Sequence, residues 1–168
     1  INFADPNLVL INARRANVGT VQVRGIDVQA AAAINTQEAG TFTLGLNGTY
    51  FITYKTGEAN TPLTERVGDI AFPVRFQARG TAGWRLGGFA IQATLNHVAG
   101  YRNTNSTLVP RIRANDTVDL DLSYAFGEDT GNFERNMRFG LNVRNLFNRA
   151  PPVADLNNGY DATYASAL

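Results

Sequence analysis

The sequence predicts an all-β protein, an antiparallel meander of about six long strands of the length that crosses a membrane. Three observations support this fold class. Apolar and polar residues alternate with a period of two along most of the chain, as on the two faces of a strand. The alternating segments run over roughly 12 to 18 residues, whereas soluble strands have about 5 to 6 and membrane-crossing strands about 9 to 11. Short and long connections also alternate, which is typical of outer-membrane barrels.

The first two strands are expected at residues 18–35 and 41–55. In the second of these, even positions carry apolar side chains and odd positions carry polar ones, with a single exception. This is the pattern of a two-faced strand and not that of a helix. In the first strand the apolar parity changes near Gly25, because Val23 stands at an odd position and Ile26 at an even one. A β-bulge near Gly25 is the simplest explanation of this change.

Four further strands are expected at residues 74–86, 89–101, 117–126 and 137–147, each with the same alternation. Because a slip by one residue would reverse every side chain of a strand, the parity predicts which residues share a face. The apolar face is expected to contain Phe42, Leu44, Leu46, Phe76, Ile91, Leu95, Leu120, Leu122, Phe139 and Leu141. The polar face is expected to contain Thr43, Asn47, Arg75, Arg79, Gln92, Asp119, Asp121 and Arg144.

The connections between these strands alternate in length. Short turns are expected near Gln37, at Gly87, where a glycine pair can supply positive φ, and near Thr130. Long polar connections cover residues 56–72 and 102–115. Outer-membrane barrels have short turns on the periplasmic side and longer loops outside. The three short turns are therefore expected together at one end of the meander.

Aromatic residues gather at both ends of the expected strands. Those near the short turns are Trp84, Phe89 and Phe126. Those near the long loops are Tyr50, Tyr54, Tyr101 and Phe147. Aromatic residues favour strands in general, but two separate groups are typical of a barrel whose strands end at the two membrane interfaces.

Composition excludes several function classes. The chain has 168 residues, with 15 basic and 14 acidic ones and a net charge of +1, so it is not a strongly basic nucleic-acid binder. It has no cysteine and one histidine, which leaves little material for a thiolate, a disulfide or a histidine-based metal centre. Charged residues make up 17%, against about 25% in a soluble domain. We therefore expect no catalytic residues, no metal and no cofactor.

Three segments resemble signatures of the TonB-dependent outer-membrane receptors. Residues 24–28, Arg-Gly-Ile-Asp-Val, resemble a barrel strand of that family, and residues 141–152 resemble its near-C-terminal signature around Asn-Leu-Phe-Asn. Tyr160 and Asp161, followed by Tyr164, resemble the approach to its last strand. The resemblance implies a barrel of about 22 strands with an N-terminal plug, in the outer membrane of a Gram-negative bacterium. It also implies uptake of a scarce ligand, such as an iron–siderophore, cobalamin or glycan, with energy from the TonB system.

The resemblance also divides the chain. Residues 1–168 would be the C-terminal portion of the barrel, in which 1–17 form an extracellular loop, 18–147 form six strands and 148–168 form the last extracellular loop. The start of the chain has neither Met nor the pattern of a signal peptide, so we expect a piece of a longer protein with the plug and the last strand outside it. The implied partners are outer-membrane lipid, the plug domain of the same protein, TonB through the N-terminal region, and a small-molecule ligand. No nucleic-acid partner is expected.

Charged side chains at the polar parity are the candidate site residues. Those expected to face the barrel lumen are Arg75, Arg79, Arg85, Asp119, Asp121, Arg138 and Arg144. Asp119 and Asp121 share a face and could in principle act as an acid–base pair or bind Ca²⁺, but we expect them to pair with arginines of neighbouring strands. Arginine forks could also hold the plug or steer an anionic ligand. His97 stands at the apolar parity near a long loop, where an interface residue is expected rather than a metal ligand.

Two other interpretations remain open at this point. A passive, porin-like channel would need at least eight closing strands, and only six are clear. A soluble β-sandwich binding module would show turns every 8 to 12 residues or so and would fold without detergent. An enzyme is the least expected class, since no phosphate-binding loop, nucleophile elbow or dinucleotide fingerprint is present.

Overall fold

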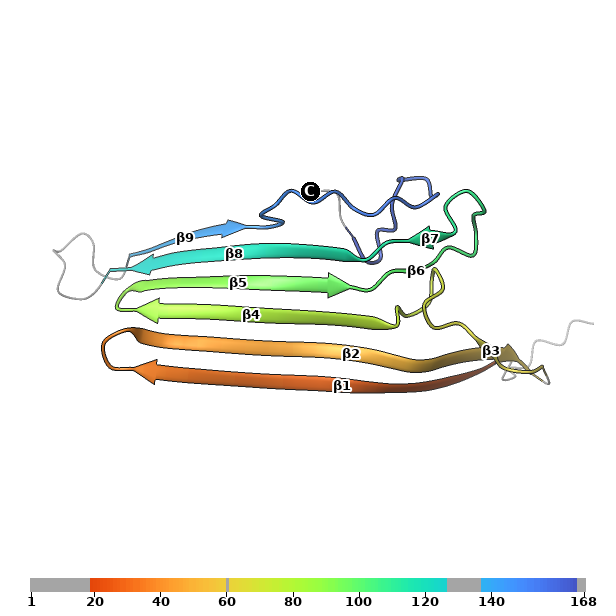
Figure 1. The fold of residues 1–168 in the computed structure, drawn as a ribbon, viewed down its shortest axis with the longest axis horizontal. Coiled ribbons are helices and arrows are strands. Elements are labelled where there is room, and N and C mark those ends of the chain that lie inside the picture. Colours follow the sequence, from red (N-terminus) through yellow and green to blue (C-terminus); the bar gives the residue numbers. More distant parts are fainter. Residues whose placement is uncertain (1–18, 60, 127–136, 166–168) are drawn as a thin grey trace, which may run out of the picture.

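The computed structural model describes residues 19–59, 61–126 and 137–165. The main sheet has seven strands, and six of them form a continuous path in which each pairs antiparallel with its neighbour (Figure 1). These six are β1 (Gly19–Thr36), β2 (Gly40–Glu58), β4 (Phe76–Leu86), β5 (Phe89–Val98), β8 (Asn115–Ala125) and β9 (Arg138–Val143), while β3 (Thr64–Glu65) joins beside β2. The predicted all-β meander is therefore confirmed for the described residues. The expected loop at residues 1–17 and the turn near Thr130 lie outside them.

Three short strands belong to the long connections. Strand β3 (Thr64–Glu65) pairs with the end of β2, while β6 (Tyr101–Arg102) and β7 (Arg111–Ile112) form a two-stranded sheet of their own. The described short turns, between β1 and β2 and between β4 and β5, lie at one end of the sheet, and the long connections lie at the other (Figure 1). No helix of the described residues is long and apolar enough to cross a membrane.

The last described strand ends earlier than expected. Strand β9 stops at Val143, whereas the alternation predicted a strand to Phe147. Asn145 and Asn148 adopt positive φ angles of 49° and 47°, and the Asn148 N–H donates to the Asn145 carbonyl at 2.7 Å. Asparagine tolerates this left-handed conformation better than most residues. The chain therefore turns while the apolar–polar alternation of the sequence continues.

The predicted bulge near Gly25 is confirmed. Arg24 pairs with Thr53 and Gly25 with Phe51, so the register shifts between these two positions. The unmatched residue is Ile52, which places the additional residue in β2 and not in β1. A β-carbon at Gly25 would lie 3.1 Å from the carbonyl oxygen of Tyr50, so glycine permits the close approach of the two strands there.

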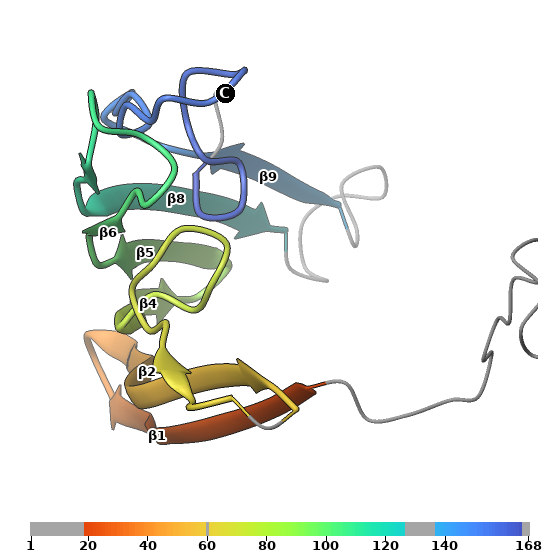
Figure 2. The ribbon, with the colours of Figure 1, turned by 90° about the vertical axis from the view of Figure 1, so that its right-hand side faces the viewer.

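The register confirms that apolar and polar residues of the sheet segregate. Directly paired residues point to the same face, and two rows of partners cross the sheet. One row is apolar and consists of Ile34, Phe42, Trp84, Ile91, Leu122 and Leu141. The next row consists of Thr43, Gly83, Gln92, Asp121 and Asn142. The sheet is curved when viewed along its strands, and the long connections lie over its concave side (Figure 2).

The buried core lies among the long connections and not under the sheet. It consists of Ile70, Val74, Tyr101, Ile112 and Ala154, with Val98 and Tyr164 packed against it. Large side chains of the apolar face remain exposed, for example Leu44 at 56% and Leu141 at 58%. The sheet therefore has one uncovered apolar face, while the long connections have a small core of their own, which we call the loop cap.

Candidate functional site

A polar groove lies on the face of the sheet opposite the apolar one. It has a volume of about 660 Å³ and is formed by strands β4, β5, β8 and β9 together with the C-terminal segment. Its charged and amide-bearing residues are Arg79, Asn96, Asn115, Asp119, Asp121, Asn142, Arg144, Asn145 and Arg149. Residues 162–165 line the same groove, so the C-terminal segment lies over the polar face. Because that segment belongs to the loop cap, the cap lies over one end of the groove.

The two carboxylates of the groove bind amides and not arginines. Asp119 accepts hydrogen bonds from Asn96 Nδ2 and from the backbone N–H of Asn145, both at 2.9 Å. Asp121 accepts one from Asn142 Nδ2. Among the described residues no arginine lies within ion-pair distance of either carboxylate, so the expected pairing with arginines is wrong.

The register explains this outcome. Asp119 pairs with Thr94, whereas Arg79 pairs with Asn96 and Asn47 in the adjacent polar row. A carboxylate and an arginine therefore do not stand directly opposite each other. The amides satisfy the carboxylates, which leaves the guanidinium groups of Arg79 and Arg144 without a described carboxylate partner.

The remaining predicted arginines lie elsewhere. Arg85 and Arg138 line a second hollow of about 350 Å³ on the polar face, with Asp121 between the two hollows. Arg75 precedes β4, and its Nη1 donates to the carbonyl of Ile52 at 3.3 Å. Six of the seven predicted residues thus line two polar hollows, and Arg75 lies apart from both.

Sequence reasoning missed two buried polar groups in the groove. Thr94 is only 1% exposed, and its hydroxyl has no hydrogen-bond partner in the described part of the chain. The side-chain oxygen of Asn115 is buried and lacks a partner as well. The signal in the sequence is weak, because Thr94 is one of many threonines at the polar parity. Each of these residues therefore brings an unpaired, buried polar atom to the wall of the groove.

The loop cap is joined to the groove by a buried tyrosine–aspartate contact. Tyr101 OH donates to Asp161 Oδ2 at 2.7 Å, and the backbone N–H of Thr163 donates to Asp161 Oδ1 at 2.9 Å. Burial raises the pKa of Tyr101, and the neighbouring Asp161 raises it further. Burial opposes ionisation of Asp161, but the two hydrogen bonds outweigh it and lower the pKa of that carboxyl. The sequence placed Tyr101 in an aromatic girdle, whereas it is 5% exposed within the cap.

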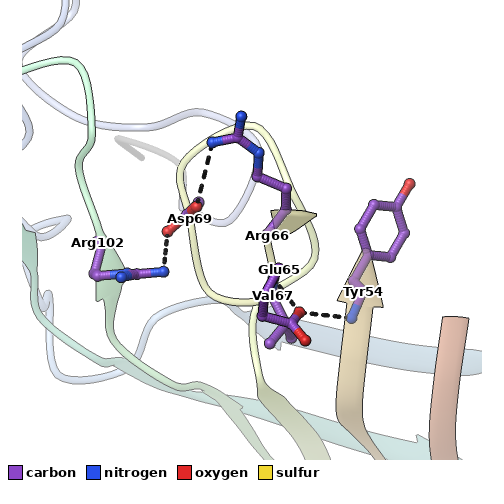
Figure 3. Close-up of polar contacts among 6 residues, drawn as sticks. All are labelled: Tyr54, Glu65, Arg66, Val67, Asp69 and Arg102. Carbon is purple, nitrogen blue, oxygen red and sulfur yellow. Dashed lines mark hydrogen bonds and ion pairs between the residues drawn. The ribbon is translucent and has the colours of Figure 1, made fainter. Parts of the chain in front are cut away.

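A second polar contact holds residues 65–69 of the cap (Figure 3). Asp69 is 3% exposed and pairs with Arg102 at 2.7 Å and with Arg66 at 3.9 Å. Glu65 accepts from the backbone N–H groups of Tyr54 at 2.8 Å and Val67 at 3.1 Å, and these hydrogen bonds lower the pKa of Glu65. The backbone N–H of Ile70 also donates to the Arg102 carbonyl at 2.8 Å. The cap is thus tied to both β2 and β6.

His97 contacts a carboxylate at the outer margin of the apolar face. Its Nδ1 lies 2.5 Å from Asp116 Oδ1, its ring lies 5.5 Å from that of Phe76, and Arg149 lies 3.7 Å from the other oxygen of Asp116. No group of three or more potential metal ligands occurs among the described residues.

The aromatic residues at the short-turn end form a band of ring contacts. Trp84 packs against Phe42 and Phe89 with centroids 6.5 and 5.8 Å apart, and Phe126 packs against Tyr124 and Phe139 at 4.9 and 5.9 Å. Between Trp84 and Phe76, β4 rises about 26 Å at roughly 3.3 Å per residue. A strand tilted by about 40° would then span about 20 Å, close to the apolar band of about 25 Å in outer-membrane barrels.

Comparison with known proteins agrees with this architecture. Residues 2–146 match the family described as TonB dependent receptor-like, beta-barrel. No curated protein and no solved structure gives a match. The match covers most of the chain and all of β1 to β9. With its antiparallel meander, its uncovered apolar face and its aromatic band, the chain belongs to the TonB-dependent receptor β-barrel family, whose members are receptors and transporters of the Gram-negative outer membrane.

Proposed function

We propose that this chain forms part of the wall of a receptor that takes up a scarce ligand with energy from TonB. In this proposal the sheet belongs to a barrel of about 22 strands, and residues 148–165 belong to its last extracellular loop. The polar face lines the lumen and contacts the plug domain and the passing ligand, while the apolar face contacts outer-membrane lipid. An iron–siderophore, a cobalamin and a glycan are the ligand classes to test.

One observation carries this proposal. The polar groove is overlain at one end by the loop cap, whereas the opposite face of the sheet is apolar and exposed. A wall that separates lipid from a polar lumen requires this arrangement. The arginines Arg79 and Arg144 provide donors on the lumenal side.

Uptake by the full-length protein tests the proposal. Cells that express it would be given labelled siderophore, cobalamin or glycan, with and without functional TonB. We expect one ligand class to accumulate only when TonB is functional. Accumulation at the same rate without TonB would favour the passive channel, and a failure of all three ligands to accumulate in either strain would contradict uptake of these classes.

Paired variants test the groove within the same assay. The double variant Arg79→Ala with Arg144→Ala removes the two donors that lack a described carboxylate partner, and we expect it to reduce uptake at least about tenfold, since hydrogen bonds to charged groups contribute about 1.5–3 kcal/mol each. Arg24→Ala with Lys55→Ala, both outside the groove, removes the same number of charges and should leave uptake within about twofold. Equal effects of both variants would contradict a role for the groove.

A further inference from the structure

A second groove lies in the outer loops, adjoins the polar one and shares Arg149 and Pro151 with it. It runs between residues 108–114 and residues 149–153 and has a volume of about 620 Å³. Three arginines line it, namely Arg111, Arg113 and Arg149, and all three are exposed. We call it the arginine groove. The proposed uptake of ligand does not use Arg111 or Arg113, which line this groove alone.

The charge of the arginine groove is only partly balanced. Arg149 lies 3.7 Å from Asp116, whose other oxygen binds His97. Neither Arg111 nor Arg113 has a described carboxylate within ion-pair distance. The nearby Asp155 instead accepts a hydrogen bond from Ser106 Oγ at 2.6 Å. The groove therefore presents an excess of positive charge, which favours an anionic occupant.

The walls of the groove are apolar and held in place. Leu108 is 86% exposed on one wall and Val153 is 69% exposed on the other. The Ser106–Asp155 hydrogen bond joins the two segments, and Ser106 Oγ also accepts from the backbone N–H groups of Leu108 and Val109 at 3.1 and 3.2 Å. Three prolines line the groove and limit its backbone freedom. A preorganised site loses less entropy when it binds a ligand.

The position of the groove points to the membrane surface. Arg149 contacts Asp116, which pairs with His97 in the outermost row of the apolar parity, and the His97 ring packs on Phe76. Phe147, between β9 and the groove, is 73% exposed. Basic side chains that lie next to an apolar surface are expected at the depth of the lipid headgroups, where they contact anionic groups. Because Asp116 and His97 stand at the apolar parity, the contact of Arg149 with Asp116 connects the groove to the loop end of the apolar face.

We propose that the arginine groove binds the phosphate group of a lipid in the outer surface of the membrane. The planar fork of each guanidinium matches the oxygens of a phosphate, and the exposed Leu108 and Val153 contact the apolar part of the same molecule. A free anion would use the arginines but gain nothing from the apolar walls. A lipid uses both, which is why the lipid is the proposed occupant.

The test uses the full-length protein, purified in a non-ionic detergent and incorporated into vesicles of zwitterionic lipid. Binding is measured for a phosphorylated glycolipid and for its dephosphorylated form with the same acyl chains. We expect the phosphorylated form to bind at least about tenfold more tightly, because each basic residue near an anionic headgroup contributes roughly fivefold. Equal binding of the two forms would overturn the proposal.

Three variants assign the binding to the groove. Arg111→Ala with Arg113→Ala should weaken binding of the phosphorylated lipid about tenfold or more, whereas Arg24→Ala with Lys55→Ala removes the same charge at the opposite edge of the sheet and should change it less than about twofold. Leu108→Asn should weaken lipid binding and leave binding of inorganic phosphate unchanged. If the double variant has no effect, or if Leu108→Asn changes neither ligand, the groove is not a lipid site.

Folding of each variant is checked by its resistance to unfolding in sodium dodecyl sulfate without heating. Should the double alanine variant fail to fold, Arg113→Lys keeps the charge and removes the guanidinium fork. We then expect a loss of affinity for the phosphorylated lipid alone, and unchanged affinity would count against the proposal.

Discussion

Tyr101 and Asp161 illustrate how individual residues hold the loop cap. They are far apart in the sequence, yet the hydroxyl of one donates to the carboxylate of the other at 2.7 Å, and both side chains are largely buried. Tyr164 packs edge-to-face against Tyr101 with ring centroids 5.5 Å apart and donates to the carbonyl of Phe72 at 3.1 Å. Residues from two long connections and from the C-terminal segment thus form the cap.

Removing the Tyr101 hydroxyl should loosen the cap. The variant Tyr101→Phe leaves the ring in place and takes a donor from a buried carboxylate, which costs about 1–3 kcal/mol. We expect faster proteolysis within residues 148–165 of the full-length protein, followed by mass spectrometry of the fragments. Tyr164→Phe is the matched control, because its hydroxyl binds a neutral carbonyl and not a carboxylate. A Tyr101→Phe variant that is as resistant as the wild type would show that this contact does not hold the cap.

The same pair predicts how the cap depends on pH. The pKa of Asp161 is lowered in the folded protein, so its contribution to stability is present above the ordinary value of 3.8 and is lost as the pH falls through the lowered value. The pKa of Tyr101 is raised, so its contribution is present below the ordinary value of 10.0 and declines as the pH rises above it. Hydrogen exchange of residues 152–164 should therefore be slowest, relative to the intrinsic rate, between these two values. Protection that does not change on either side of this window would contradict the prediction.

At the scale of the strands, the turn between β1 and β2 depends on one glycine. Gly40 has a φ of +82°, and a β-carbon there would lie 2.1 Å from the backbone oxygen of Arg85. Gly87, in the turn between β4 and β5, has a φ of +55° but open space around the same position. A substitution at Gly87 would therefore introduce backbone strain alone, whereas one at Gly40 would introduce both backbone strain and a steric clash.

Alanine at these two glycines should have unequal effects. Gly87→Ala introduces only the left-handed strain, about 1–2 kcal/mol. Gly40→Ala adds overlap with the backbone of β4 and should lower stability by clearly more than Gly87→Ala. Unfolding of the full-length protein by urea in lipid vesicles measures the difference. Equal losses would indicate that β2 and β4 can move apart at this point.

An arginine introduced on the apolar face of β2 should be more costly than one introduced on its polar face. Leu44 and Thr43 are adjacent and both exposed in the isolated sheet, but Leu44 belongs to the apolar face and Thr43 lines a polar hollow. Leu44→Arg should therefore destabilise the full-length protein in a bilayer by more than about 1 kcal/mol, since a cation on the lipid-facing surface costs from about 0–1 kcal/mol at the interface to about 2–4 kcal/mol at the midplane. Thr43→Arg should cost less than about 1 kcal/mol, as substitutions away from lipid do. Refolding into vesicles measures both, and a reversed order would contradict the assignment of the faces.

For the whole molecule, the sheet requires surroundings that the chain does not itself supply. Its apolar face is far larger than the few hundred Å² that a soluble monomer usually exposes, and the buried core lies in the loop cap and not behind this face. Strands β1 and β9 each have a neighbour in the sheet on one side only among the described residues. Unpaired edges are costly in hydrocarbon and attract other chains in water.

We therefore expect residues 1–168 alone not to form a stable monomer in water. Expression of this segment without detergent, followed by sedimentation and far-ultraviolet circular dichroism, should give aggregates or an unfolded chain. Detergent micelles or lipid vesicles should increase its β-structure. A cooperatively folding, β-rich monomer in plain buffer would favour the soluble sandwich and contradict the barrel wall.

The sequence by itself determined the main sheet, because a period of two assigns each side chain to one face and short turns join neighbours in order. It therefore predicted the strands around Leu44 and Leu120, the bulge near Gly25 and the polar row that contains Asp121. Tertiary structure alone decided what depends on distant partners. The register across the strands gave Asp119 an amide partner and not an arginine, the turn at Asn145 ended β9, and packing between remote loops buried Tyr101 against Asp161. Local alternation contains no information about such contacts, since they are set by which rows meet and by how the loops fold back on the sheet.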